Sequence, residues 1–299
     1  MADYLRYEFD SNDDYIFLRD VLKKELEISQ SLLAKLKNEH RIMVNGQQTL
    51  TNYRLQPGDV VTVDIALEEN NYIPPIEMPL DIIYEDQDLL VVNKPPGISV
   101  HPVKDLAKAT LAHAVSYYWQ QKDICSVFRP INRLDRNTSG LVVIGRSQYA
   151  HQALFQQMKQ GDVHRSYLAL AEGEFPHDSM TIELPIAHPD PGNDPRRAVD
   201  AGGKKAVTDL RVIRRYKGYT LLELSLHTGR THQIRVHLSY LGYPVCGDNL
   251  YGKSSCMISR QALHAYHLTL KQPRHKDPLQ FTAPLPADMA ALIRQIDLL

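Results

Sequence analysis

The sequence has little cysteine and lacks long apolar runs. Its three cysteines, Cys125, Cys246 and Cys256, are scattered and show no Cys-x-x-Cys spacing, which predicts neither a disulfide framework nor a zinc site. No run approaches the roughly 18 apolar residues of a membrane helix. The first residues, MADYLRYEFDSNDD, lack the basic start and apolar middle of a signal peptide. We therefore expect a cytoplasmic protein without a metal site or membrane association.

The chain also lacks an excess of basic residues, since its formal net charge is −1. This argues against a uniformly basic nucleic-acid-binding protein. The charge is unevenly distributed, because residues 1–70 carry 8 Lys/Arg and 13 Asp/Glu, whereas residues 196–236 carry 10 and 3. A local basic stripe attracts phosphates even when the whole chain is nearly neutral. A solvated, charge-rich hairpin face gives the same composition, and this alternative stays open.

The most informative feature that is present is the segment RLDRNTSG at residues 133–140, followed by the apolar run LVVIG. A polar turn that leads into a buried strand displays its side chains while the strand anchors them. Asp135 stands between Arg133 and Arg136, whose charges favour the ionised carboxylate. Such a carboxylate serves as a nucleophile or a general base. The same residues also suit a simple turn without chemistry, so this segment alone does not decide.

Two further segments decide between these interpretations. Residues 90–102 read LVVNKPPGISVHP, and residues 226–252 read LHTGRTHQIRVHLSYLGYPVCGDNLYG. With RLDRNTSGLVV between them, they resemble, in order and spacing, the RluA-type family of RNA pseudouridine synthases. The resemblance covers roughly residues 75–290. Three separated segments are far more specific than one.

The resemblance implies isomerisation of specific uridines to pseudouridine in RNA, a reaction without a cofactor. It implies that Asp135 is the catalytic carboxylate and that Arg133 helps to turn the target base out of the RNA. The family's active-site tyrosine corresponds to Tyr167, in RSYLALAEG, and its basic partner to Arg235, in THQIRVHL. One position departs from the family, because Asn132 stands where a histidine is usual. This departure concerns how the turn and the flipped nucleotide are held.

Physical chemistry suggests how these residues would act. The target base must leave its stack, at a cost of a few kcal/mol. We expect Arg133 to fill the vacated space and Tyr167 to stack on the flipped uracil. A planar guanidinium that gives two parallel hydrogen bonds to a carboxylate keeps it ionised in a poorly hydrated site. We therefore expect Arg235 to pair in this bidentate manner with Asp135.

The pattern of predicted elements favours an α+β fold. Strands and helices are mixed without strict βαβ alternation, so a largely antiparallel sheet is expected. The resemblance sharpens this to the pseudouridine synthase fold, with a mixed central sheet crossed by an active-site cleft. Residues 188–204 are expected to be a long loop. Helical periodicity is found at residues 110–122, 147–161, 231–242 and 285–299. In the third of these helices, His232, Arg235 and Ser239 are expected to share one face.

Residues 1–67 resemble the alpha-L RNA-binding module that precedes the catalytic domain in some members of the family. Two helical patterns, the second with Ser29 or Ser31 as cap, are followed by RIMVNGQ, where Asn45-Gly46 is a hairpin turn signal, and by a closing strand in QPGDVVTVDIAL. The acidic total weakens the case for strong RNA binding, and a purely structural cap is the alternative. The basic residues that cluster on or beside the two helices are Lys23, Lys24, Lys35, Lys37 and Arg41.

The domain boundaries follow from this division. Residues 68–79 are expected to be a linker, because Pro74-Pro75 bars both a helix and a central strand. Residues 80–299 would then form the catalytic domain. The N-terminal module favours ribosomal RNA as the substrate, with transfer RNA also compatible. No obligate protein partner is implied.

Two other functions stay open. The first is a non-catalytic RNA-binding or ribosome-assembly factor that has kept the fold, which the intact set of Asp135, Tyr167 and Arg235 disfavours. The second is an Asp-dependent glycoside hydrolase. That chemistry normally needs two carboxylates that flank the scissile bond, and we expect no second acid beside these motifs.

Overall fold

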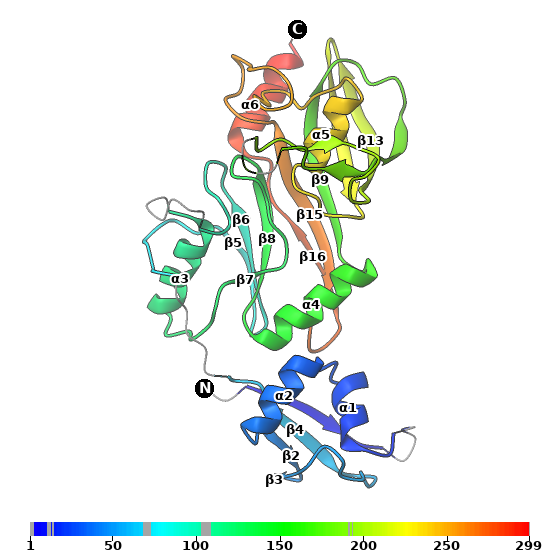
Figure 1. Ribbon diagram of the computed structural model, residues 1–299. Helices are drawn as coiled ribbons and strands as arrows, with labels where there is room; N and C mark the ends of the chain where they lie inside the picture. Colours follow the sequence, from blue (N-terminus) through cyan, green and yellow to red (C-terminus); the bar gives the residue numbers. More distant parts are fainter. Residues whose placement is uncertain are drawn as a thin grey trace.

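The structure is a computed structural model that describes residues 3–10, 13, 15–67, 73–102, 109–190, 192 and 194–298. The described residues form a small N-terminal unit and a larger unit built on a ten-stranded sheet (Figure 1). Of the linker expected at 68–79, residues 68–72 lie outside the described residues. The structure bears out an α+β fold with a mixed sheet.

The N-terminal unit has a four-stranded antiparallel sheet in the order β1-β4-β2-β3, with two helices. Its elements are β1 (Tyr4–Glu8), α1 (Leu18–Lys24), α2 (Gln30–Asn38), β2 (Ile42–Val44), β3 (Gln47–Gln48) and β4 (Val60–Asp64). The α2 helix begins at Ser29, whose hydroxyl accepts the Leu32 N–H, and Asn45 and Gly46 turn between β2 and β3 with positive φ. Strand β1 was not predicted, because Leu5 is its one fully buried residue and the alternation is weak.

The N-terminal unit has a hydrophobic core of its own. Leu22 of α1, Leu36 of α2 and Val61 of β4 are fully buried in it. The same cluster includes one residue of the large unit, Tyr149. The two units are thus separately packed and meet at a shared contact.

The large unit is one sheet in the order β10-β13-β14-β9-β15-β8-β6-β5, in which β16 also pairs with β15 and β7 with β8. Its strands are β5 (Ile82–Glu85), β6 (Leu89–Lys94), β7 (Arg129–Pro130), β8 (Ser139–Gly145), β9 (His164–Glu172), β10 (Ser179–Glu183), β13 (Val207–Tyr216), β14 (Tyr219–Leu226), β15 (Leu263–Lys271) and β16 (Pro278–Thr282). Among the described strands of this sheet, β15 and β8 run parallel and the other pairs antiparallel.

Four helices accompany this sheet, each inside a range predicted from the sequence. They are α3 (Leu111–Gln121), α4 (Gln148–Gln160), α5 (Gln233–Tyr240) and α6 (Ala287–Ile296). The expectation of a loop throughout 188–204 was wrong in part, because β12 (Ala198–Val199) pairs with β11 (Ile186–Ala187). Two-residue strands are too short to show a period, so no sequence pattern indicates this pair.

A glycine sets the close approach of the two parallel strands. Gly140 on β8 has a φ of +115°, and a Cβ there would overlap the carbonyl of Ala265 on β15. No other residue fits this position without moving the backbone. Beside it, the Ser139 hydroxyl and Nδ1 of His264 are 3.0 Å apart. The turn that carries Asp135 leads directly into this fixed point.

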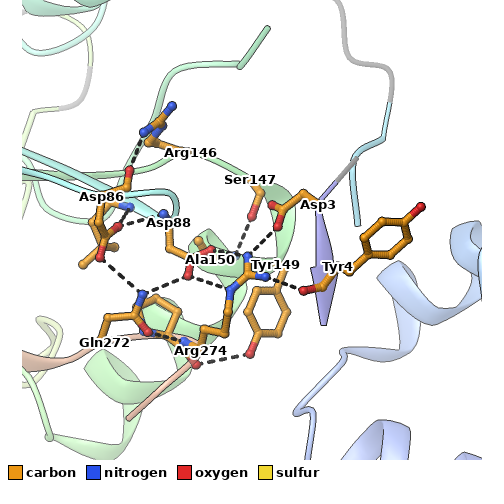
Figure 2. Close-up of polar contacts among 12 residues, drawn as sticks. Asp3, Tyr4, Asp86, Asp88, Arg146, Ser147, Tyr149, Ala150, Gln272 and Arg274 are labelled. Carbon is orange, nitrogen blue, oxygen red and sulfur yellow. Dashed lines mark hydrogen bonds and ion pairs between the residues drawn. The ribbon is translucent and has the colours of Figure 1, made fainter. Parts of the chain in front are cut away.

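Arg274 joins the two units of the molecule (Figure 2). It lies in the turn between β15 and β16. Its guanidinium contacts the fully buried carboxylate of Asp88 in the large unit at 3.0 Å, and Asp3 of the N-terminal unit at 2.7 Å. Its Nη1 also donates to the Tyr4 carbonyl at 2.6 Å. Arg274 thus forms ion pairs with acids of both units.

Candidate active site

Asp135 lies in the turn between β7 and β8, where the Thr138 N–H donates to the Asp135 carbonyl at 3.1 Å. The turn forms part of the wall of a cavity of about 830 Å³. The same cavity is lined by Arg133, Tyr167 and Arg235. The structure therefore brings the four residues singled out from the sequence to one place, from three separate segments: the turn between β7 and β8, strand β9 and helix α5.

Lys94, the lysine of the NKPPG segment, donates a hydrogen bond to the turn that carries Asp135. It is fully buried, and its ammonium group donates to the carbonyls of Pro95, Ile98 and Arg136 at 2.9, 3.0 and 3.1 Å. Burial lowers the pKa of Lys94 to about 7, although the charge of Asp135 opposes this shift. Lys94 thus ties two of the three recognised segments together.

Asn132, the departure from the family pattern, also holds the turn. Its buried side-chain amide donates to the Leu141 carbonyl at 2.9 Å, and its amide oxygen accepts the Val143 N–H at 2.9 Å. This is how a neighbouring strand would bond to β8. The asparagine therefore fixes the start of the Asp135 turn to β8, at the wall of the cavity.

Arg235 does not pair with Asp135 in the expected manner. Its Nη1 donates one hydrogen bond to Asp135 Oδ2 at 2.8 Å. Its bidentate pair goes instead to Asp248, at 2.6 Å from Nε and 2.8 Å from Nη2. Burial by itself lowers the pKa of Arg235, but the bonds and charges of Asp248 and Asp135 outweigh it and raise that pKa. The expected bidentate pair with Asp135 was therefore wrong.

The expectation of no second acid was wrong as well, because Asp248 lies within the third recognised segment. Its side chain is fully buried behind Arg235 and is not among the residues that line the cavity. Asp135 and Asp248 therefore do not both line the cavity, whereas a glycosidase requires two carboxylates that flank the scissile bond. The acid was missed because nothing in GDNLYG shows that the aspartate is buried beneath an arginine of another element.

His232, Arg235 and Ser239, which were expected to share one face of α5, all contact Tyr251. The His232 Nδ1 lies 2.8 Å from the Tyr251 hydroxyl, and Ser239 donates to the Tyr251 carbonyl at 2.7 Å. The guanidinium of Arg235 lies over the Tyr251 ring, 5.0 Å from its centre. His232 Nε2 is 3.8 Å from Asp135, and burial lowers the pKa of His232 although Asp135 opposes this. Tyr251, another residue that sequence reasoning missed, thus fixes two neighbours of Asp135.

Tyr167 lies on β9, with 5% of its surface exposed, at the wall of the cavity. Burial raises its pKa, and the charge of Asp135 raises it further while that of Arg165 lowers it. The phenol therefore stays neutral at physiological pH. A neutral aromatic ring beside the carboxylate suits contact with an uncharged base.

The basic stripe at 196–236 is divided between two environments. Some of its cations are paired on the surface of the large unit: Arg211 with Glu223, Arg214 with Asp297 and Arg215 with Asp178. Others line the active-site cavity or a second cavity of about 520 Å³: Arg197, Lys204, Arg230 and Arg235. The two cavities share Arg133, Arg197 and Arg230. The solvated-hairpin interpretation holds for the first group, and the second group gives the cavities a positive lining.

Helix α4 lies between the cavity and the N-terminal unit. His151 and Phe155 line the cavity, with ring centres 6.4 Å apart and planes within 19°, and 54% of Phe155 is exposed. On the same helix, Gln148 accepts a hydrogen bond from Lys35 of α2 at 3.0 Å. The cavity and the N-terminal unit are therefore neighbours, with one helix in contact with both.

Among the helices in the described ranges, none has the length and apolar character that crossing a bilayer requires.

Comparison with known proteins gives consistent results. A model of the family described as RNA pseudouridylate synthase matches residues 88–240. The chain is 40% identical over 276 residues to the uncharacterized RNA pseudouridine synthase YlyB of Bacillus subtilis, which covers 91% of each chain. It is 37% identical to the ribosomal large subunit pseudouridine synthase D of Zymomonas mobilis, over 82% of this chain and 81% of the relative.

A solved structure is similar as well. Human RNA pseudouridylate synthase domain containing 1 covers 75% of this chain and 97% of its own, with a TM-score of 0.58 and 27% identity. Another relative, the ribosomal large subunit pseudouridine synthase D of Xanthomonas campestris, is 34% identical over 89% of this chain and 84% of its own.

Proposed function

We propose that this chain, which belongs to the RNA pseudouridylate synthase family and isomerises uridine to pseudouridine in RNA, uses Asp135 as its catalytic carboxylate. The observation that carries the proposal is the position of Asp135, at the wall of the cavity and 2.8 Å from a buried arginine. We also propose that its substrate is large-subunit ribosomal RNA.

The reaction defines what the site must provide. The bond between N1 of uracil and C1′ of the ribose breaks, the uracil turns, and C5 bonds to C1′. N1 gains a proton and C5 loses one, so the atoms balance without a cofactor. Asp135 supplies the nucleophilic carboxylate. Arg235 donates a charge-assisted hydrogen bond that holds this carboxylate in place.

The other residues of the cavity hold the nucleotide. The uridine enters the cavity out of its stack, which costs a few kcal/mol. Tyr167 contacts the face of the uracil with its buried, neutral ring. Arg133 is exposed where the two cavities meet, and it fills the space that the base leaves in the RNA. The cavity volume of about 830 Å³ exceeds that of one nucleotide base and leaves room for its neighbours.

Residues 1–67 form the RNA-binding module, 68–79 the linker and 80–299 the catalytic domain in this proposal. The separate core of the N-terminal unit and its contact with α4 support this division. The basic side chains of the module that face solvent include Lys23 and Lys37, whereas Arg41 is paired with Asp64 at 2.9 Å. A bound RNA would thus reach from the cavity across α4 to the module.

Ribosomal RNA of the large subunit is favoured because relatives at 34 and 37% identity are named for that activity. The test is a map of modified uridines in ribosomal and transfer RNA from cells with and without the gene. We expect pseudouridine to be lost at defined positions of large-subunit ribosomal RNA, and to be restored by the purified protein on an unmodified transcript. Loss confined to transfer RNA would overturn the choice of substrate.

A further inference from the structure

Arg165 is a buried cation that uses little of its hydrogen-bonding capacity. It lies on β9 with 9% of its surface exposed, and its Nε has no hydrogen-bond partner. Its Nη2 makes one long contact, 3.4 Å, to the Leu226 carbonyl. No acid of the described residues lies within ion-pair distance of it. Burial of an unpaired charge costs several kcal/mol, so a buried charged group is normally paired with a group of opposite charge.

Arg165 faces the active-site cavity. It lines the cavity together with Tyr167, and alternate residues of a strand share a face about 6.6 Å apart. The space beside the guanidinium is kept open by Gly229, where a Cβ would lie only 3.3 Å from Nη1. The orphaned group is thus next to the residue expected to contact the base, on the same side of the cleft.

The charge of the lining is not balanced within the protein. Asp135 already forms an ion pair with Arg235 at 2.8 Å. The arginines of this cavity without an acidic partner in the described ranges are Arg133, Arg165, Arg197 and Arg230. Arg133 and Arg230 are exposed, where water solvates a charge, but Arg165 is buried. A ligand group with a full negative charge would satisfy it, whereas a neutral carbonyl would only repeat the contact with Leu226.

We propose that Arg165 binds a phosphodiester group of the RNA next to the target uridine and thereby positions the nucleotide against Asp135. The inference rests on the proposed function, because the phosphodiester is the anionic group that an RNA substrate brings. The free Nε and the loosely held Nη2 of one guanidinium form the planar donor pair that fits two phosphate oxygens.

The experiment uses a short stem-loop RNA that contains the mapped uridine. One version has phosphates throughout, and two have a neutral methylphosphonate, either 5′ or 3′ of the target. All three carry the same 2′-O-methyl groups at both linkages. Binding is measured for the wild-type chain, Arg165→Gln, Arg165→Lys and, as a matched control, Arg294→Gln, an exposed arginine of α6. Thermal unfolding of each variant and turnover of an unmodified stem-loop accompany the binding data.

We expect Arg165→Gln to weaken binding of the all-phosphate RNA roughly 10- to 100-fold. The slope of log K against log salt should fall by about 0.7, the value for one single-stranded phosphate. One of the two methylphosphonates should weaken binding by the wild type similarly and leave Arg165→Gln unchanged. Arg165→Lys should keep the salt slope with reduced affinity, and Arg294→Gln should bind as the wild type does.

The proposal is overturned if both methylphosphonates weaken Arg165→Gln as much as the wild type, or if Arg165→Gln keeps full affinity and salt slope. If Arg165→Gln does not fold, the Arg165→Lys variant decides, because it should keep the salt slope with reduced affinity, and wild-type affinity in this variant would overturn the proposal. A wild-type chain that fails to isomerise the stem-loop contradicts the proposed function. If the wild-type chain isomerises the stem-loop and Arg165→Gln binds it with full affinity and salt slope, only this inference is contradicted.

Discussion

Arg235 makes its bidentate pair of hydrogen bonds with the fully buried Asp248, and one further bond with Asp135. Asp248 also accepts the backbone N–H groups of Leu250 and Tyr251 at 3.0 and 3.2 Å. The carboxylate is therefore fixed to its own loop, and it fixes the guanidinium in turn. Asp248 orients Arg235 toward Asp135 and is not among the residues that line the cavity.

Asp248→Asn should impair both stability and turnover. An amide replaces one acceptor with a donor that opposes the guanidinium, and loss of a buried pair costs about 3–5 kcal/mol. We expect a lower free energy of unfolding in urea and a single-turnover rate at least tenfold lower, with RNA affinity nearly unchanged. Asp297→Asn, which breaks the exposed pair with Arg214, is the control and should cost less than about 1 kcal/mol. Normal stability and rate in Asp248→Asn would show that the pair does not support the site.

Lys94 should make the free energy of unfolding depend on pH above neutrality. Its native pKa is lowered to about 7, whereas in the unfolded chain it is the ordinary 10.5. Between these values the unfolded chain binds more protons, so stability rises with pH, by up to about 1.4 kcal/mol per unit. We expect the unfolding free energy of the wild type minus that of Lys94→Met to increase from pH 7 to pH 9. A difference that is flat over this range would contradict the lowered pKa.

Phe155→Ala should weaken RNA binding. The ring is 54% exposed and lies near that of His151 at the cavity wall, so it offers a surface on which a neighbouring base stacks. Stacking of one base contributes about 1–3 kcal/mol. The dissociation constant of the stem-loop should therefore rise by a factor of roughly 5 to 150. Phe155→Trp should restore binding, and Ile213→Ala, at an exposed position of β13, should have no effect. Equal affinity of Phe155→Ala and the wild type would exclude the stacking role.

The N-terminal unit is tested by Lys23→Glu combined with Lys37→Glu. Both side chains are exposed, so the fold should be retained. We expect the double variant to bind and modify large structured RNA less well, while turnover of the short stem-loop changes little. Arg294→Glu in α6, at the opposite end of the molecule (Figure 1), is the matched control. Equal losses on both RNAs would favour the structural-cap interpretation of the unit.

Much of the fold followed from the sequence, because long elements show their period. The helices α3 and α4 lie where periodicity placed them, and β8 lies where the apolar run after RLDRNTSG predicted a buried strand. The short β11, β12 and the weakly alternating β1 did not follow. Their pairing depends on neighbours distant in the sequence, which local patterns do not report.

The site was predictable where motifs carried it and not where burial did. Asp135, Tyr167 and Arg235 were identified from segments that resemble a family. Asp248 and Arg165 were not identified, although Arg165 stands two residues before Tyr167 and so shares its strand face. An acid or an arginine in a sequence is by default assigned to the surface. Only the tertiary structure shows that Asp248 is buried beneath Arg235, and that Arg165 has no acidic partner among the described residues and an Nε without a hydrogen bond.

The central claim is that Asp135 performs the chemistry, and its most direct measurement is the single-turnover rate of Asp135→Asn on the mapped RNA. The substitution keeps the size of the side chain and its contact with Arg235, but removes the nucleophilic charge. We predict no detectable pseudouridine, with stem-loop affinity within a few-fold of the wild type. Pseudouridine formed by Asp135→Asn at an appreciable rate would contradict the account.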